Sequence, residues 1–130
     1  MSNLTVQQAL QRGIEAHQAG NLQEADKYYT AILQAQPNHP DANHNMGVLA
    51  VRVGKVEQSL PFFQKALEAD HTVQQFWISL IDALIQLKRH QDARSLLKQA
   101  QEKGHNGDIF DKLEARLGET HHENTKISNE

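Results

Sequence analysis

The chain has 130 residues, no cysteine, and a formal net charge of −3 from 13 Lys and Arg against 16 Asp and Glu. This length suits a single domain, because domains commonly have about 100–150 residues. The absence of cysteine excludes disulfides, thiolate metal ligands and cysteine nucleophiles, and the slightly acidic balance argues against nucleic acid as a partner. No apolar run approaches the roughly 20 residues that span a bilayer, and the N-terminus lacks the features of a secretory signal. We therefore expect a soluble, cytoplasmic protein that is not inserted in a membrane.

Residue types recur along the chain with a period of 34 residues. The matched sets are Gly13 and Gly47; Gly20 and Gly54; Ala25, Ser59 and Ala93; and Tyr29, Phe63 and Leu97. Three copies follow one another without a gap, over residues 6–39, 40–73 and 74–107. A fixed period of this length is the signature of a repeat architecture.

Each copy contains two helical patterns separated by a breaker. In the second copy, apolar residues run from Met46 to Val53, stop at Gly54, and resume after it at spacings of three and four. Glycine suits the left-handed conformation that ends a helix, and Pro40 suits the first turn of one. Each copy therefore predicts a helix-turn-helix hairpin that buries its apolar face only by stacking on a neighbour. Small residues such as Gly47 would let the two helices of a hairpin approach closely.

This pattern resembles the tetratricopeptide repeat, and the likeness covers residues 6–107. The residues that carry it are Gly13, Ala16, Gly20, Ala25, Tyr29, Leu33 and Pro37 in the first copy; Gly47, Ala50, Gly54, Phe63, Ala66 and Leu67 in the second; and Trp77, Leu80, Leu84, Ala93 and Ala100 in the third. The resemblance implies an all-α, right-handed solenoid of three helix-turn-helix repeats that binds partners on its concave face. Ile81 departs from the family pattern, because a small residue is expected there, and we expect the third helix pair to splay slightly.

A seventh, capping helix is predicted over residues 108–117, with Gly118 as its stop. Its apolar face is formed by Ile109, Phe110, Leu113 and Leu117. Such a helix would cover the exposed end of the third repeat. The repeat domain is thus expected to span residues 1–118, and residues 119–130 are expected to form a disordered polar tail.

The first helices of the repeats line the concave face in the resembled family, and residues four and seven apart share one helix side. The predicted groove is lined by Leu10, Ile14, His17, His44, Val48, Val51, Ile78, Asp82 and Ile85, and edged by Gln7, Gln11, Asn45, Arg52 and Gln86. Six of the nine lining residues are apolar, which favours a bound partner segment. Two alternatives remain open: the repeats simply tolerate apolar residues on this face, or another copy of the chain covers it.

Some members of the resembled family bind acidic chaperone tails through a clamp of Lys, Arg and Asn side chains. Among the groove residues only Arg52 and Asn45 offer such groups, and Asp82 opposes them. A carboxylate would be left unmatched in an apolar groove. We therefore do not expect this kind of ligand.

Metal binding and catalysis are not indicated. The best cluster of metal-ligating residues is His39, Asp41 and His44, and its spacing differs from the i, i+4 pair that brings two imidazoles together on a helix. No glycine-rich phosphate loop, paired buried carboxylates or nucleophile motif occurs in the sequence. We expect no catalytic residue, no metal site and no cofactor.

The sequence thus predicts a non-enzymatic scaffold that binds a partner peptide or helix in an apolar concave groove. One alternative is a self-associating structural protein that forms a homo-oligomer. Another is a free-standing relative of the repeat module that precedes bacterial sulfotransferase and glycosyltransferase domains, which residues 36–50 and 76–87 resemble.

Overall fold

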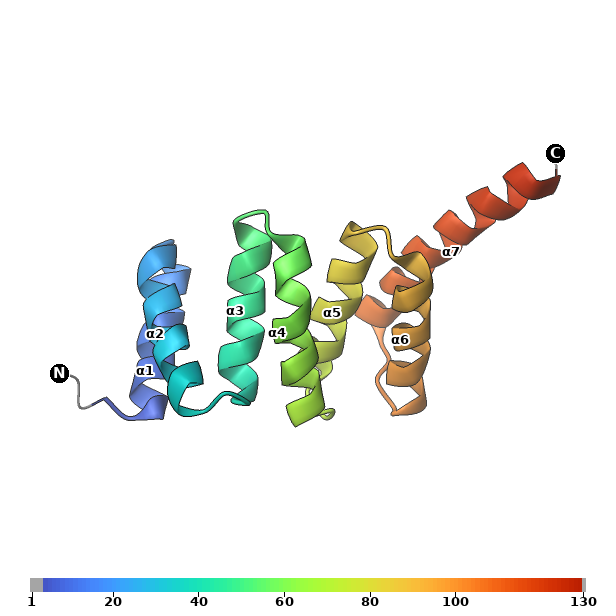
Figure 1. Ribbon diagram of the computed structural model, residues 1–130. Helices are drawn as coiled ribbons and strands as arrows, with labels where there is room; N and C mark the ends of the chain where they lie inside the picture. Colours follow the sequence, from blue (N-terminus) through green and yellow to red (C-terminus); the bar gives the residue numbers. More distant parts are fainter. Residues whose placement is uncertain (1–3, 130) are drawn as a thin grey trace. The chain divides into compact units, whose positions relative to one another are not determined.

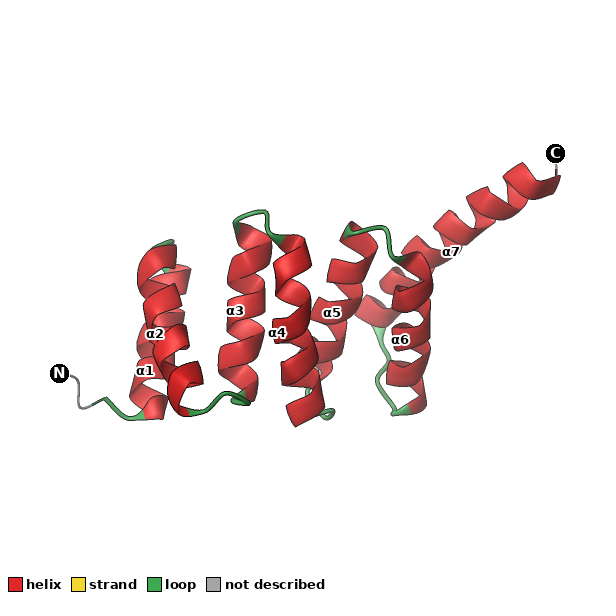
Figure 2. Ribbon diagram, viewed as in Figure 1, coloured by secondary structure: helices red, strands yellow, loops and turns green. Residues whose placement is uncertain are grey.

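The computed structural model describes the backbone of residues 4–129 and the side chains of residues 4–118. These residues form seven helices and no strands (Figure 1, Figure 2). The helices are α1 (Val6–Gln18), α2 (Leu22–Ala35), α3 (Pro40–Arg52), α4 (Val56–Ala69), α5 (Gln74–Gln86), α6 (His90–Glu102) and α7 (Asp108–Asn129).

The helices keep the period of the sequence. Helices α1, α3, α5 and α7 begin at residues 6, 40, 74 and 108, and helices α2, α4 and α6 begin at residues 22, 56 and 90. Both series step by 34 residues, which is also the period of the sequence. Helix α7 begins where the first helix of a fourth hairpin would begin.

The chain divides into two compact units, Met1–His71 and Thr72–Glu130. The first unit consists of the hairpins α1–α2 and α3–α4, in which each first helix packs against its own second helix and α2 also packs against α3. The second unit consists of α5, α6 and α7, and α7 packs against both of the other helices.

Two glycines set the close packing of the hairpins in the first unit. A Cβ atom added at Gly13 would lie 2.6 Å from Cε1 of Tyr29, and one added at Gly47 would overlap the Phe63 ring. Both rings are buried, with 0% of Tyr29 and 2% of Phe63 exposed. The aromatic ring of each second helix therefore lies directly on the backbone of the first helix, as the small residues in the sequence predicted.

The turns inside the hairpins use the left-handed conformation. Gly20 and Gly54 have φ angles of 82° and 83°, as predicted for the glycines at these breakers. Lys88 occupies the equivalent position in the third hairpin with a φ of 62°. An L-residue adopts this conformation at a cost that glycine avoids.

The connection between α2 and α3 is held by side-chain hydrogen bonds. Pro40 is the first residue of α3, and the imidazole of His39 accepts a hydrogen bond from the backbone N–H of Ala42 at 3.1 Å. The amide of Asn43, which is 1% exposed, donates to the carbonyl oxygens of Pro37 and His39, at 3.0 Å each. These bonds fix the direction in which the second hairpin leaves the first.

The second unit is built around larger side chains. Ile81 is fully buried in α5 where the equivalent residues of α1 and α3 are glycines, and the backbones of α5 and α6 are in less extensive close contact than those of the other two pairs. This agrees with the looser third pair expected from Ile81. The ring of His105 lies between Trp77 and Phe110, at centroid distances of 5.7 Å and 6.2 Å.

Helix α7 differs in length from the prediction. Its backbone passes the expected stop at Gly118 and is helical as far as Asn129. A Cβ atom added at Gly118 would meet no atom within 4 Å, so this glycine stands in open space within the helix. The side chains of residues 119–130 lie outside the described part of the chain, so the disordered polar tail expected there stays a prediction.

Two glycine substitutions should have opposite effects on stability. We expect Gly47→Ala to lower the free energy of unfolding by about 1–3 kcal/mol, because the new methyl group overlaps the Phe63 ring. The matched change Gly118→Ala should raise it by about 0.5–1 kcal/mol, because alanine is the better helix former and meets no neighbour. Urea denaturation measures both, and a Gly47→Ala protein as stable as wild type would contradict the packing described.

Candidate functional site

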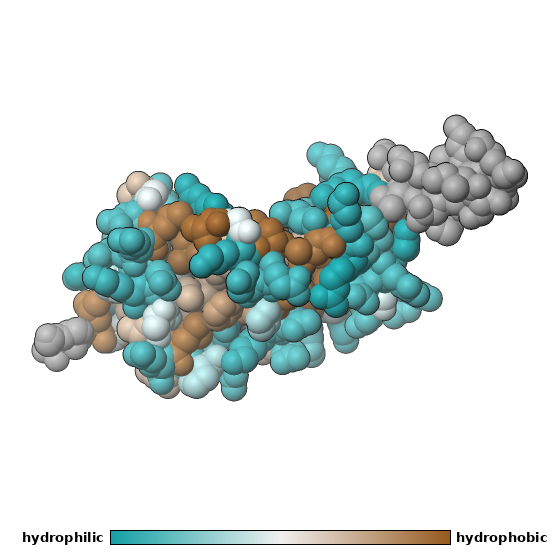
Figure 3. All heavy atoms as spheres, turned by 45° about the horizontal axis from the view of Figure 1, so that its top comes forward, coloured by the Kyte–Doolittle hydropathy of each residue, from teal (hydrophilic) through white to brown (hydrophobic). Residues whose placement is uncertain are grey.

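Most of the residues predicted to bind a partner in the first unit lie at its surface. We call this surface the α1–α3 face. Its half-buried members are Ile14, His17, His44, Asn45, Val48 and Val51, and its exposed members are Gln7, Gln11 and Arg52. The aliphatic side chains are thus neither sealed in the core nor fully solvated. Figure 3 shows patches of apolar atoms among polar side chains on the viewed surface of the molecule.

Leu10 is the exception among the predicted lining residues. It is 7% exposed and belongs to a core cluster that also contains Ala9, Tyr29, Ile32 and Leu49. Leu10 therefore contributes to packing between helices, and the expectation that it lines an open groove is corrected. The equivalent positions one and two periods later, His44 and Ile78, are half-buried.

A chain of polar side chains crosses the α1–α3 face. The Tyr29 hydroxyl lies 3.4 Å from Nδ1 of His17 and is hydrogen-bonded to the Asn45 side chain, which also bonds His44. The guanidinium of Arg52 donates to the backbone carbonyl of His17 at 3.4 Å. These hydrogen bonds lie within the first unit, and they link α1 and α2 to α3.

Both histidines of this face have a lowered pKa, which favours the neutral imidazole. Burial, followed by the neighbouring Arg52 charge, lowers the pKa of His17 below its ordinary value. Burial also lowers the pKa of His44, whose ring lies 5.4 Å from that of Phe63, although the Asn45 hydrogen bond and the Asp41 charge act in the opposite direction. Around neutral pH the α1–α3 face thus presents uncharged imidazoles beside aliphatic side chains.

The second unit carries the remaining predicted lining residues on α5. Ile78, Asp82 and Ile85 are half-buried there. Asp82 is not an isolated acidic group: it forms an ion pair with Arg116 of α7 at 2.9 Å and accepts a hydrogen bond from Gln86 at 2.7 Å. The Asp82 carboxylate is therefore held by a side chain of α7 as well as by one of its own helix.

Tyr29 and Arg116 contact the candidate surfaces, although the sequence patterns did not assign them to a groove. Tyr29 has the spacing of a core residue, and its ring is in the core, but its hydroxyl reaches the α1–α3 face. Arg116 follows Asp82 by 34 residues. The repeat period could therefore have indicated that Arg116 of α7 lies beside Asp82 of α5.

Neither a metal site nor a membrane helix is found in the described part of the chain. No three His, Asp or Glu side chains there gather closely enough to hold a metal ion. In the best candidate cluster of the sequence, His39 caps α3 and His44 packs against Phe63, so these two imidazoles have separate structural roles. None of the described helices is both long and apolar enough to cross a membrane.

A family comparison settles which class of repeat this is. The tetratricopeptide repeat model matches residues 16–72 and 50–117. The chain belongs to the tetratricopeptide repeat family. The family and the all-α helical-repeat fold predicted from the sequence are thereby confirmed.

Solved tetratricopeptide repeat structures are similar in fold. The TPR2B domain of yeast Sti1, in a complex with pHsp70, has a TM-score of 0.79 and 19% identity, over 88% of this chain and 97% of that one. The first TPR domain of Spaghetti (RPAP3), bound to an HSP90 peptide, has a TM-score of 0.80 and 16% identity, over 88% and 91%.

A third similar structure is part of a larger enzyme. The O-GlcNAc transferase of Thermobaculum terrenum has a TM-score of 0.68 and 20% identity, over 75% of this chain and 19% of that one. At these identities the likenesses concern the fold. No curated protein sequence matches this chain significantly.

The two histidines should give the tetratricopeptide repeat domain a measurable pH dependence. Because each folded-state pKa is lower than the ordinary value of 6.5, the unfolded chain takes up protons first as the pH falls. We expect stability to be full above pH 6.5, to decline as the pH falls from there toward the folded-state pKa values, and then to level off with respect to these groups. Urea denaturation at several pH values tests this. The change in the free energy of unfolding per pH unit below pH 6.5 should be smaller in a His17→Gln/His44→Gln protein. An unchanged slope in that variant would contradict the assignment.

Proposed function

We propose that the α1–α3 face binds a segment of a partner protein and that the chain acts as a protein-interaction scaffold. The observation that carries the proposal is the burial of Ile14, Val48 and Val51, which are aliphatic side chains of first helices that stay only half-buried. Apolar surface left beside hydrogen-bonded polar groups favours association. Peptide complexes are known for similar tetratricopeptide repeat structures, which supports this use of the fold.

The chemistry of the α1–α3 face favours an apolar segment over an acidic tail. The amide of Asn45 is engaged by Tyr29 and His44, and Arg52 bonds the His17 carbonyl. A bound carboxylate would have to displace these bonds and would lie beside aliphatic side chains in place of water. Neutral imidazoles can instead accept or donate single hydrogen bonds to a peptide backbone.

The second unit carries a separate candidate contact surface on α5. Ile78 and Ile85 supply aliphatic area there, and the Asp82–Arg116 pair supplies a polar contact of both signs. A partner side chain of either charge can pair with one member, so this position would set the register of a segment bound to α5 more than its affinity.

The other candidate roles remain predictions. Self-association would cover the same aliphatic side chains with a second copy. A role as a module beside a transferase domain receives support from the fold likeness to the Thermobaculum enzyme, although no residue of this chain is assigned to catalysis.

A substitution on the α1–α3 face should separate binding from folding. A random dodecapeptide library displayed on phage is selected on the wild-type chain, and the dissociation constant of a selected peptide is measured by fluorescence anisotropy. We expect Val48→Glu to weaken binding at least about tenfold, because the carboxylate would be desolvated by the peptide. The matched control Gln58→Glu adds the same charge at an exposed position of α4 and should leave binding unchanged.

Both variants should melt within a few degrees of wild type, because neither position is sealed in the core. Equal binding by Val48→Glu and wild type, or the failure of selection to enrich any peptide, would contradict the proposal. A collapse of the melting temperature in Val48→Glu would instead place this valine in the core.

A further inference from the structure

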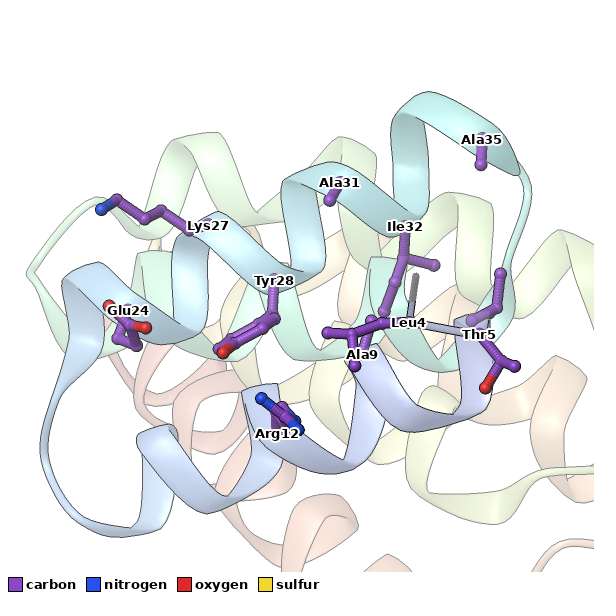
Figure 4. Close-up of a pocket in the computed structure, with 11 residues that line it drawn as sticks. Leu4, Thr5, Ala9, Arg12, Glu24, Lys27, Tyr28, Ala31, Ile32 and Ala35 are labelled. Atoms are coloured by element: carbon purple, nitrogen blue, oxygen red, sulfur yellow. The ribbon is translucent and has the colours of Figure 1, made fainter. Parts of the chain in front are cut away.

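A second candidate surface lies between α1 and α2 and shares no residue with the α1–α3 face. It is a depression with a volume of about 700 Å³. Figure 4 shows Ala9, Tyr28 and Ile32 lying between the two helices, with Glu24 near one end and Ala35 near the other. Ala9 and Ile32 are buried and Tyr28 is half-buried, so the floor of the depression is apolar.

The dimensions of the depression suit a helix. It follows α2 from Glu24 to Ala35, a distance of about 17 Å at 1.5 Å per residue, which is three helical turns. Ala31 and Ala35 are exposed along this line. Small side chains at a contact allow two helix axes to approach to about 8 Å.

The second hairpin shows what lies beside the equivalent surface. Met46 and Phe62 follow Arg12 and Tyr28 by 34 residues. They line a depression together with Leu22, Gln23 and Asp26, which are residues of α2. A helix therefore already stands beside this surface one period later, and α2 is an internal template for an occupant of the α1–α2 depression.

The charges of the two surfaces differ. Arg12 and Lys27, both exposed, line the α1–α2 depression at positions where the second hairpin has Met46 and Pro61. The cations outnumber Glu24, the acidic residue among the lining residues. An occupant that complements this depression carries carboxylates beside its apolar stripe.

The neighbouring side of α1 argues for a single helix and against an end-to-end stack of two chains. Gln8 and Glu15 are exposed on α1, whereas Ala42 and Leu49, one period later on α3, are buried in the core cluster that contains residues of α2. A stacked hairpin would cover Gln8 and Glu15 and leave their polar groups without water. A lone helix in the place that α2 takes beside the second hairpin would lie near Glu15, as α2 lies near Leu49, but it would cover less of α1 than a stacked hairpin.

We propose that the α1–α2 depression binds one amphipathic helix of a partner protein, with small or aliphatic side chains facing Ala9, Tyr28 and Ile32 and carboxylates facing Arg12 and Lys27. Asp26 of α2 lines the same depression as Met46, so its counterpart on an incoming helix would face Arg12. This interaction uses a surface separate from the one proposed above for a partner segment.

The test uses a synthetic helix copied from α2. The probe is a peptide of residues 21–36 held helical by a lactam between Glu24 and a lysine introduced by Tyr28→Lys, a bridge on the side of the peptide away from Asp26. It is titrated into the full ¹⁵N-labelled chain. We expect amide shifts confined to residues around the depression, with affinity that falls as salt concentration rises.

Three variants of the full chain sharpen the test. Ala31→Glu should weaken the probe at least about tenfold while the fold persists, because Ala31 is exposed and the new carboxylate would block the depression and be desolvated by the bound helix. Arg12→Met, which installs the residue found one period later, should keep part of the affinity and lose most of its salt dependence. Val51→Glu on the α1–α3 face is the control and should bind the probe as wild type does.

Several results would overturn the proposal. They are no shifts at all, shifts centred on the α1–α3 face, or equal binding by Ala31→Glu and wild type. Light scattering that shows a dimer dissociated by Ala31→Glu would also overturn it, because the occupant would then be a second copy. A loss of probe binding in Val51→Glu, with Ala31→Glu unaffected, would assign the peptide to the other surface.

Discussion

The first unit depends on the contact between an aromatic ring and the backbone of a glycine. Tyr29 and Phe63 lie on Gly13 and Gly47 so closely that a single methyl group would displace them. This contact brings the axes of the two helices in each hairpin together and fixes their rotation about those axes. With the rotation fixed, Val48 lies about 100° around the α3 axis from the glycine that holds the ring, and this valine is half-buried.

The same contact links the core to the α1–α3 face, which we propose as the partner surface. The Tyr29 ring is sealed in the core, yet its hydroxyl meets His17 and Asn45 at the edge of the α1–α3 face. A displaced ring would therefore cost packing and would also release the polar groups that keep this face ordered. The result is a surface with fixed, neutral hydrogen-bonding groups beside aliphatic area, which limits the entropy lost when a partner segment binds.

Much of the architecture could be predicted from the sequence because a repeat period fixes which residues are equivalent. The spacing of Gly13 and Gly47 predicted the hairpin contacts, and the helix starts follow the same 34-residue step. Ile81 likewise predicted the looser third pair.

The period does not fix how deeply equivalent residues are buried. Leu10 and His44 occupy equivalent positions one period apart. Leu10 is buried in the core cluster, whereas His44 is half-buried. The partners of polar groups also escaped prediction, because hydrogen bonds such as that of Tyr29 depend on side-chain reach across helices. Helix α7 passed Gly118 because one glycine in open space weakens a helix without ending it.

The most direct test of this account is a NOESY spectrum of the ¹³C-labelled chain, read at the protons of the Phe63 ring. If the ring lies on the glycine, we expect strong cross-peaks from the ring to the Hα protons of Gly47 and weaker ones to the His44 ring, and the Gly47 cross-peaks should exceed any to the methyl groups of Val48. Cross-peaks to Val48 with none to Gly47 would show that α3 is rotated with its valine inward. The ring-on-glycine contact and the partner surface derived from it would then both be wrong.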